Sequence, residues 1–438
     1  IKSLGITHVQ FLPTYDFYGV DDIDKDRFYN WGYNPLQYFV PSGWYSENPS
    51  DPYSRINEML MLIDEFHKNG IRVNFDVVFN HIFMANVHGF EKLLPGYSFR
   101  YEPDGRLSNA SGCGNVIATE RYQNKRFVTD VLKYYAEVYN ISGFRFDLMG
   151  LLDINTLNYA KKELDKIDDT IMLYGEGWDM HNPLPSELRP TSYNHRSLKG
   201  YAFFNDRFRD YIRGSQWSNI KGYAFNTEKN AFDINHLVMG SCVDYYKFDY
   251  PHQSINYVEC HDNYTFYDFG IRECREKEFM VLDAARLALS IVLISEGVPF
   301  IHAGQEFFRT KNGVENSYKS RGIINKFDYQ RRNKYIDNVK MVKDLISIRF
   351  EYDVFRLDNK EEIEKRIHIL DGLSNYHMTS FIFEDEKCNL FVIIKNDYGK
   401  LDIDLSNTTM IFDGYKRVNI KSDVYNICTP GVYILRKE

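Results

Sequence analysis

Short apolar runs, rich in β-branched and aromatic residues, recur up to about residue 350, and polar residues and then a helical pattern follow each one. Two of the intervening segments, Arg55 to Lys68 and Lys125 to Tyr139, carry apolar residues at helical spacing. Alternating strands and helices favour a parallel sheet with helices on both faces. The predicted strands are HVQFLP near residue 8, RVNFDVVFN near 72, GFRFDLMG near 143, IMLYGEGW near 171, SINYVECHD near 254 and GVPFIHAGQE near 297.

Ionisable and amide residues stand at the ends of several predicted strands. They are the run Asp76 to His81, then Asp147, Glu176, and the pair His261 and Asp262. A (β/α)₈ barrel places its active site at the carboxyl ends of its strands. An open doubly wound sheet would also bind ligands there, but no glycine fingerprint follows the first strand. We therefore predict an α/β fold, a (β/α)₈ TIM barrel, over residues 1–350.

Two segments depart from the strand–helix alternation. Residues 82–124 are too long for an ordinary βα loop, so we predict an inserted subdomain after strand 3 that helps to wall the site. Beyond residue 350, short alternating runs separated by turn residues predict a C-terminal antiparallel β-sandwich domain over 351–438. The first residues have the pattern of a helix end, a glycine that terminates the helix, and a strand. We therefore expect the sequence to begin inside the barrel, with upstream modules not visible.

Composition and charge exclude several classes of protein. The chain is 44% hydrophobic and 26% charged, the balance of a globular protein, and no run approaches the ~20 apolar residues of a membrane span. The net charge is −8, so the basic surface that binds nucleic acid is not expected. We expect neither a nucleic acid nor a membrane as partner. We expect the cytoplasm as compartment, with secretion left open because the N-terminus is not visible.

The sequence does not indicate a metal site, a disulfide framework or a nucleophilic triad. The six cysteines form no CxxC pair and are expected to be reduced, buried thiols, and no GxSxG motif occurs. Asp21, Asp22 and Asp24 lack the glycine and distal glutamate of a calcium loop, so a solvated turn is favoured and structural calcium is possible but not predicted. Three further histidines are expected to be core or surface residues: His8, His67 and His302.

Two acids have the spacing of a catalytic pair. Glu176 follows Asp147 by 29 residues, close to the ~30 of one βαβ unit, so the two should follow adjacent strands. Paired carboxylates in this position are the minimum apparatus for glycoside hydrolysis, in which one attacks and the other protonates the leaving oxygen. Either motif alone is equally compatible with a structural ion pair. Their occurrence together at matching strand ends favours catalysis.

Neighbouring residues suit each acid to a different role. Arg145 lies two residues before Asp147, hence on the same face of the strand, and would hold that carboxylate ionised as a nucleophile requires. Glu176 is followed by Gly177 and Trp178. These apolar neighbours would raise the pKa of Glu176 and suit it to act as the acid.

Four motifs resemble the signature regions of the α-amylase family of glycoside hydrolases. They are DVVFNH (76–81), GFRFDLMG (143–150), GEGW (175–178) and VECHDN (258–263). Within that family the chain resembles the type I pullulanases, because YNWGYNP (29–35) is similar to their YNWGYDP motif. Residues 90–115 and 301–318 also resemble that group, and the likeness extends from residue 1 to about 350.

The resemblance implies a debranching hydrolase that cleaves α-1,6-glucosidic bonds in pullulan, glycogen or limit dextrins by a retaining double displacement. Asp147 matches the nucleophile, Glu176 the general acid/base, and Asp262 the carboxylate that stabilises the transition state. The partner implied is an α-glucan polysaccharide or oligosaccharide, and no metal or organic cofactor takes part in this chemistry.

Further positions match substrate-binding residues of the family. Arg145 matches the partner of the nucleophile, and Tyr33 the aromatic platform under the sugar at subsite −1. The remaining matches are His81 and His261, as donors to hydroxyls of that sugar, Leu148 and Trp178, on the acceptor side, and Asn263, beside Asp262.

Three residues depart from the family pattern. Asn34 stands where an Asp is usual, and Arg321 and Gly322 stand where relatives commonly have Pro-Asp. The core motifs are shared within the α-amylase family, so an isoamylase-like or α-1,4-acting hydrolase and a transglycosylase stay open as alternatives. A non-catalytic glucan-binding barrel is also an alternative, although it would not need all three acids.

Overall fold

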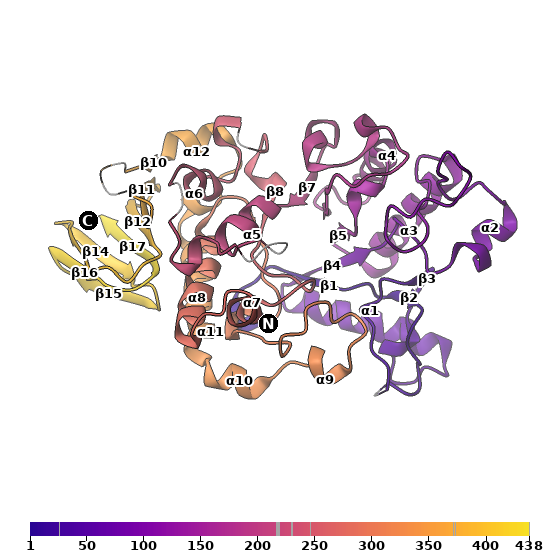
Figure 1. The fold of residues 1–438 in the computed structure, drawn as a ribbon, viewed down its shortest axis with the longest axis horizontal. Helices are drawn as coiled ribbons and strands as arrows, with labels where there is room; N and C mark the ends of the chain where they lie inside the picture. The colour runs from indigo at the N-terminus through magenta and orange to yellow at the C-terminus, as the bar shows by residue number, and fades with distance from the viewer. Residues whose placement is uncertain are drawn as a thin grey trace.

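The computed structural model describes residues 1–25, 27–215, 220–228, 231–245, 247–370, 372 and 374–437. Seven parallel strands form one curled sheet in the order β1-β4-β5-β6-β7-β8-β9 (Figure 1). Within the described ranges, β1 and β9 are the edge strands and do not pair with each other. The strands are β1 (His8–Phe11), β4 (Arg72–Val77), β5 (Gly143–Phe146), β6 (Met172–Gly175), β7 (Tyr201–Phe204), β8 (Ser254–Asn256) and β9 (Val298–Pro299).

The predicted strands are all present, but the sequence pattern missed one member of the sheet. That strand, β7, has four buried residues and pairs with β6 on one side and β8 on the other. A short antiparallel pair, β2 (Tyr15–Phe17) and β3 (Pro35–Pro41), was also missed; its register is irregular, which weakens the alternation of apolar and polar residues.

Long helices cover the outer face of the sheet. The first, α1 (Pro52–Lys68), begins where the Asp51 side chain accepts a hydrogen bond from the backbone N–H of Tyr53, and it turns Met59 and Ile63 inward. The others are α3 (Tyr122–Tyr139), α4 (Ile154–Leu164), α8 (Glu278–Ile294) and α11 (Ile336–Glu351). The shorter helices are α2 (Gly89–Leu93), α5 (Asp206–Ile212), α6 (Ala231–Val238), α7 (Phe266–Arg272), α9 (Gly322–Asn325), α10 (Tyr329–Lys334) and α12 (Lys360–Arg366). No helix of the described segments is long and apolar enough to cross a membrane.

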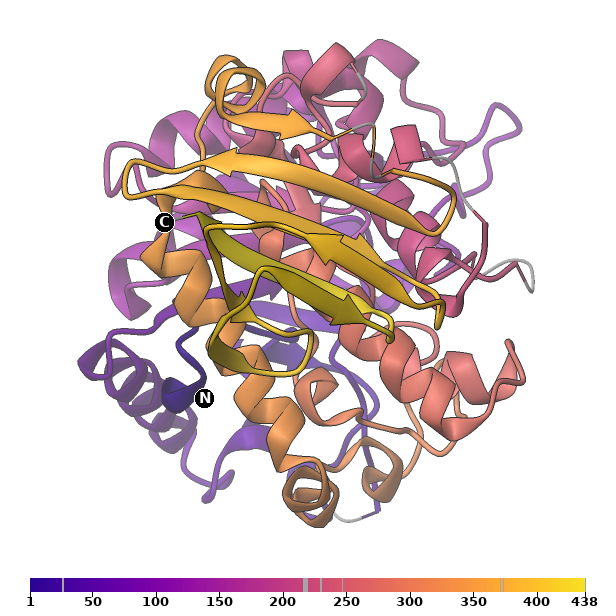
Figure 2. The same cartoon turned by 90° about the vertical axis from the view of Figure 1, so that its left-hand side faces the viewer.

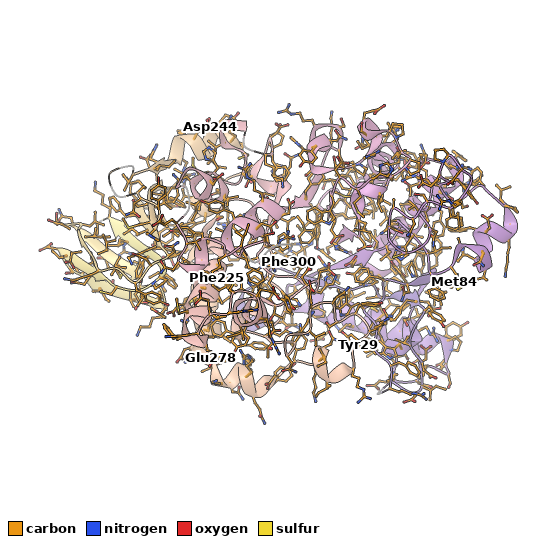
Figure 3. The ribbon with its side chains drawn as sticks, viewed as in Figure 1. Tyr29, Met84, Phe225, Asp244, Glu278 and Phe300 are labelled. Carbon is orange, nitrogen blue, oxygen red and sulfur yellow. The ribbon has the colours of Figure 1, made fainter. Side chains whose placement is uncertain are left out.

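Aromatic side chains fill the inner side of the curl. Phe204 packs edge-on against Tyr257 and against Phe300, which is labelled near the middle of Figure 3. Tyr174 joins this cluster from β6, with its ring centroid 6.0 Å from that of Phe204. Phe144 and Phe146 of β5 instead pack toward the helices. The inner face therefore presents a packed floor beneath the carboxyl ends of the strands.

Antiparallel sheets form the C-terminal part of the chain, seen face-on in Figure 2. Six strands pair in the order β10-β11-β12-β17-β14-β15, and β13 pairs with β16. Ile403 of β13 and Tyr425 of β16 pack with Ile393 and Leu435 of the larger sheet. The strands are β10 (Ile367–Ile369), β11 (Met378–Glu384), β12 (Asn389–Lys395), β13 (Leu401–Asp404), β14 (Thr408–Phe412), β15 (Arg417–Lys421), β16 (Val424–Ile427) and β17 (Gly431–Lys437). The helix α12 stands between α11 and β10, so the first of these strands begins later than residue 351.

The excursion over 82–124 is tied to the carboxyl end of β4. The backbone N–H of Ile117 donates to the carbonyl of Asn80 at 2.8 Å. The side chain of Asn115 bonds both the N–H and the carbonyl of Ile82. This segment contains α2 and two isolated bridges, so it is ordered beside the strand ends from which the candidate residues project.

Candidate active site

Three carboxylates surround the buried guanidinium of Arg145. Its Nη1 lies 3.0 Å from both oxygens of Asp76 and 3.0 Å from Oδ1 of Asp147. Its Nη2 lies 2.5 Å from Oε1 of Glu176. The pairing of β4, β5 and β6 produces this cluster, because Asp76 is in register with Arg145 and Arg145 with Tyr174. One cation thus holds acids from three neighbouring strands.

Asp147 has a second polar partner besides Arg145. The side-chain amide of Asn80 donates to Oδ2 of Asp147 at 2.8 Å and to its carbonyl at 3.0 Å. The Asp147 side chain is 13% exposed, whereas that of Asp76 is fully buried. A carboxylate fixed by two donors and still reachable from outside is suited to attack a bound substrate.

Glu176 is a buried acid whose pKa is raised. Burial raises its pKa to about 8, the charges of Asp147 and Asp262 add to the rise, and Arg145 opposes it. The backbone N–H of Leu148 donates to its Oε2 at 2.9 Å. The raised pKa that the sequence predicted is present, and its main cause is burial. A group of this kind can donate a proton to a leaving oxygen.

Leu148 has a backbone conformation that is unusual for its residue type. Its φ is 40° and its ψ 48°, in the left-handed region that costs a non-glycine residue about 1–3 kcal/mol. This conformation follows Asp147 directly and brings the Leu148 N–H to Glu176. The strained residue therefore joins the ends of β5 and β6.

Tyr33 connects Asp76 with His261. Its hydroxyl donates to Oδ2 of Asp76 at 2.6 Å and lies 2.9 Å from Nε2 of His261. The two rings are nearly parallel, with centroids 5.3 Å apart. Burial lowers the pKa of His261 to about 4, so the ring is neutral. Since the Tyr33 proton goes to Asp76, the Nε2–H of His261 donates to the hydroxyl.

Protein partners occupy both ring nitrogens of His81. Its Nε2 lies 3.0 Å from the carbonyl of Tyr33, and its Nδ1 lies 2.6 Å from Oδ1 of Asn80. Burial lowers the pKa of this histidine. The predicted role as a donor to a sugar hydroxyl would require one of these two contacts to open.

The other predicted site residues surround this cluster. Asp262 has the most exposed side chain of the three acids, at 40%, and lies close enough to Glu176 to raise its pKa. Trp178 is partly buried against the aromatic cluster inside the curl. Asn263, with a φ of 62°, lines a separate recess beside Asp262.

A supporting network behind His261 and Asp262 was not foreseen. Arg309 can only donate, so Nε2 of His302, 3.3 Å away, accepts, and Nδ1–H of His302 donates to Glu259 at 2.6 Å. Glu259 also accepts from the backbone N–H of Phe266 at 2.7 Å. His302 is therefore a buried core histidine, as expected, and it orients Glu259, whose carboxylate holds the far end of the loop that carries Asp262.

Asp76 and Asn80 are functional candidates whose contacts the sequence did not reveal. Both stand in the strand-end run that was noted for its polarity, but their partners come from β5 and from the residue after it. The one feature of the sequence that pointed to Asp76 and Asn80 was that run of polar residues at the end of a buried strand.

No group of residues in the described chain favours a metal. Cys260, His261 and Asp262 are the one described set of three possible ligands within 4.8 Å of one another. However, burial raises the pKa of the Cys260 thiol to about 12, and His261 already donates to Tyr33. In the acidic triplet, Oδ1 of Asp21 accepts from the N–H groups of Ile23 and Asp24, which is a turn.

No protein-family model matches the chain. The pullulanase of Bacillus subtilis (strain 168) is 42% identical over 403 residues, which cover 90% of this chain and 56% of that protein. A pullulanase structure from Anoxybacillus sp. LM18-11, complexed with maltotetraose, has a TM-score of 0.95 at 37% identity and covers 100% of this chain and 64% of its own.

A pullulanase structure from Paenibacillus barengoltzii, in complex with maltohexaose and α-cyclodextrin, has a TM-score of 0.94 at 37% identity. The match covers 99% of this chain and 70% of that one. The chain spans about half the length of the curated relative from Bacillus subtilis.

Proposed function

Because this chain belongs to the type I pullulanases of the α-amylase family of glycoside hydrolases, we propose that it is a debranching enzyme that cleaves α-1,6-glucosidic linkages with retention of configuration. The substrates proposed are pullulan, glycogen or limit dextrins. The observation that carries the proposal is the placement of Asp147 and Glu176 on the two terminal nitrogens of Arg145. Retention requires two carboxyl groups roughly 5–5.5 Å apart, and a shared guanidinium keeps the pair close.

The first chemical step uses both acids. Asp147 attacks the anomeric carbon while Glu176 gives its proton to the glycosidic oxygen, so the bond from carbon to oxygen breaks as the ester bond to Asp147 forms. In the second step, Glu176 takes a proton from water, and the hydroxide attacks the same carbon and releases Asp147. The side chains supply nucleophile, acid and base, so we propose that neither a metal nor an organic cofactor takes part.

Other residues serve binding and transition-state stabilisation in this proposal. Asp262 stabilises the positive charge that develops on the sugar, and Tyr33 provides the aromatic platform at subsite −1. The remaining assignments are His81 and His261 for sugar hydroxyls, Leu148 and Trp178 for the acceptor side, and Asn263 beside Asp262.

We also propose that the curled sheet is the wall of a (β/α)₈ barrel. One more strand between β1 and β9 would complete the ring, and the candidate residues stand at the strand ends where such barrels carry their sites. In this proposal residues 1–350 are the catalytic domain and 351–438 the β domain. The cysteines are free thiols, which supports the cytoplasm as compartment. Cys113 and Cys428 are exposed, so the expectation of buried thiols was wrong for these two.

Incubation of the purified chain with pullulan, and with amylose in parallel, tests the proposed function. We expect chromatography to show maltotriose from pullulan and no products from amylose, because pullulan joins maltotriose units through α-1,6 bonds. An Asp147→Asn variant, prepared in the same way, controls for contaminating activity. Products from amylose, or an unchanged pullulan chain, would contradict an α-1,6 debranching function.

A further inference from the structure

Two neighbouring residues of the loop after β9 hold both ends of the loop that carries Asp262. The ammonium of Lys311 donates to the carbonyl of His261 at 2.6 Å. At the far end, the backbone N–H of Lys311 and the hydroxyl of Thr310 donate to the carboxylate of Asp268, at 2.7 Å and 2.5 Å. Asp268 lies in the first turn of α7, so these contacts close the loop between β8 and that helix.

Asp262 is held in place by its backbone. Its carboxylate forms no hydrogen bond within the described residues, and the nearby Nε2 of His261, which is engaged with Tyr33, lies 3.5 Å from its Oδ1. The carbonyl that Lys311 binds belongs to the peptide group that joins His261 to Asp262. The orientation of this peptide group therefore sets where the Asp262 side chain leaves the backbone.

The Lys311 ammonium is held between that carbonyl and an aromatic ring. Lys311 is 1% exposed, and its Nζ lies 4.8 Å from the ring centroid of Trp31, which compensates part of the lost hydration. The same ring packs edge-on against His261, with centroids 4.9 Å apart. Burial lowers the pKa of Lys311 to about 8, so the group is a charged donor below that pH, and such donors form the stronger hydrogen bonds.

The loop that carries Lys311 is itself fixed. The guanidinium of Arg309 donates to the carbonyl of Ala303 at 3.1 Å and to that of Asn325 at 2.5 Å. The backbone N–H of Val314 donates to the carbonyl of Lys311 at 3.1 Å. Because the donor stands on a fixed support, it can determine the position of the carbonyl that it binds.

We propose that Lys311 is a positioning residue whose ammonium fixes the peptide group between His261 and Asp262, and through it the carboxylate that stabilises the transition state. The proposal rests on the proposed function, because that function gives this task to Asp262. A preorganised charge acts only from the right place, and a misplacement of about 1 Å can lower the rate about 10²-fold. Lys311 is itself buried, so it acts through these two residues.

Steady-state kinetics on pullulan compare Lys311→Met with the wild-type chain. Methionine fills the space of the lysine stem and removes the donor. We expect kcat to fall about 10-fold to 10²-fold while KM changes less than about twofold, because the lost placement matters mainly in the transition state. Lys311→Arg keeps a charged donor and should recover part of the lost kcat. If Lys311→Met does not fold, Lys311→Gln is measured in its place, with the same direction expected.

A matched control separates positioning from general stability. Lys395 of β12 is also buried, at 3% exposed, and donates to the carbonyl of Asp397 at 2.6 Å. Lys395→Met should lower Tm and leave the kcat of the folded enzyme unchanged. The same loss of kcat in Lys395→Met as in Lys311→Met would overturn the proposal.

A double-mutant cycle tests whether Lys311 acts through Asp262. In an Asp262→Asn background, Lys311→Met should lower kcat by a smaller factor than in the wild type, because both changes remove the same contribution. The assay uses α-maltosyl fluoride, whose reactive leaving group keeps slow variants measurable. An equal factor in both backgrounds would overturn the proposal.

A crystal structure of Lys311→Met gives a readout that does not depend on activity. We expect the carbonyl of His261 to turn away and the Asp262 carboxylate to move by about 1 Å. Both groups in unchanged positions would overturn the proposal. If the wild type leaves pullulan intact while the carboxylate moves in Lys311→Met, the proposed function fails and the positioning by Lys311 stands. If the wild type cleaves pullulan and Lys311→Met has the same kcat, the positioning fails and the proposed function stands.

Discussion

The backbone N–H of Leu148 donates a 2.9 Å hydrogen bond to Oε2 of Glu176. The residue after one candidate carboxylate thus positions the other, and it does so in a left-handed conformation that leucine rarely adopts. Arg145 bonds the opposite oxygen of Glu176, so both oxygens of the buried acid are held from β5 and its end. Small backbone shifts at Leu148 should therefore lower the catalytic rate.

The raised pKa of Glu176 predicts the alkaline limb of the pH profile. A general acid must carry its proton, so kcat/KM on pullulan should fall as pH rises through about 8. Glu176→Gln should lower kcat/KM by about 10²–10⁴-fold and remove this limb. Initial rates between pH 5 and pH 10 measure both, and a wild-type profile that stays flat to pH 10 would exclude Glu176 as the acid.

The close packing at Gly150 can be tested by adding a methyl group on the acceptor side of the site. A Cβ there would lie 2.0 Å from the carbonyl oxygen of Trp178, so Gly150→Ala must displace backbone about 1 Å beside Glu176. We expect about a 10²-fold loss in kcat, as misplacement of this size commonly causes. Gly89→Ala is the matched control, because a Cβ at Gly89 meets nothing within 4 Å. Equal kcat of the two variants would show that the close packing of Gly150 against Trp178 is not needed for catalysis.

Two substitutions of Tyr33 distinguish the contribution of its ring to catalysis from that of its hydroxyl. Tyr33→Phe keeps the ring beside His261 and removes the bonds to Asp76 and His261, so kcat/KM should drop about tenfold to a hundredfold. Tyr33→Ala should lose more, because the sugar platform goes as well. Steady-state kinetics on pullulan, with Tm as a check of folding, distinguish these steps. Wild-type kinetics in both variants would remove Tyr33 from the site.

Glu296 predicts a pH dependence of stability away from the site. It is fully buried, accepts from the backbone N–H of Leu357, and burial raises its pKa from 4.5 to about 8. A raised folded-state pKa stabilises the protein fully below 4.5, and this contribution is lost as pH rises to about 8. Glu296→Gln should therefore match the wild type at pH 4.5 and exceed its unfolding free energy at pH 9 by on the order of a few kcal/mol.

Unfolding at several pH values measures that difference, and Glu187→Gln, at an exposed glutamate, controls for the substitution itself. A stability gain of Glu296→Gln that is the same at pH 4.5 and pH 9 would contradict the assignment.

The order of strands and the strand-end acids could be predicted because buried parallel strands have a simple apolar signature and barrels carry polar residues at one end. β7 escaped notice because four residues at 201–204 are too few to distinguish from a loop without the pairing to β6 and β8. The closed ring was likewise inferred from the alternation of strands and helices. Pairing between the first and last strands of a sheet depends on the tertiary structure, so the sequence pattern does not show it.

Side-chain contacts across strands were beyond the sequence pattern. The period of two residues along a strand correctly placed Arg145 beside Asp147, but its reach to Asp76 and Glu176 depends on the register between strands. His81 shows the same limit, since its contact with the carbonyl of Tyr33 joins it to a distant part of the chain.

The central claim, that Asp147 attacks the sugar and Glu176 serves as acid and base, is tested most directly by trapping the covalent intermediate. In Glu176→Gln, α-maltosyl fluoride still reacts because fluoride leaves without a proton, while hydrolysis of the ester is slow without the base. Mass spectrometry of the digested protein should find a maltosyl group on the peptide that contains Asp147. A maltosyl group on the Asp262 peptide, or fluoride release without any adduct, would contradict the account.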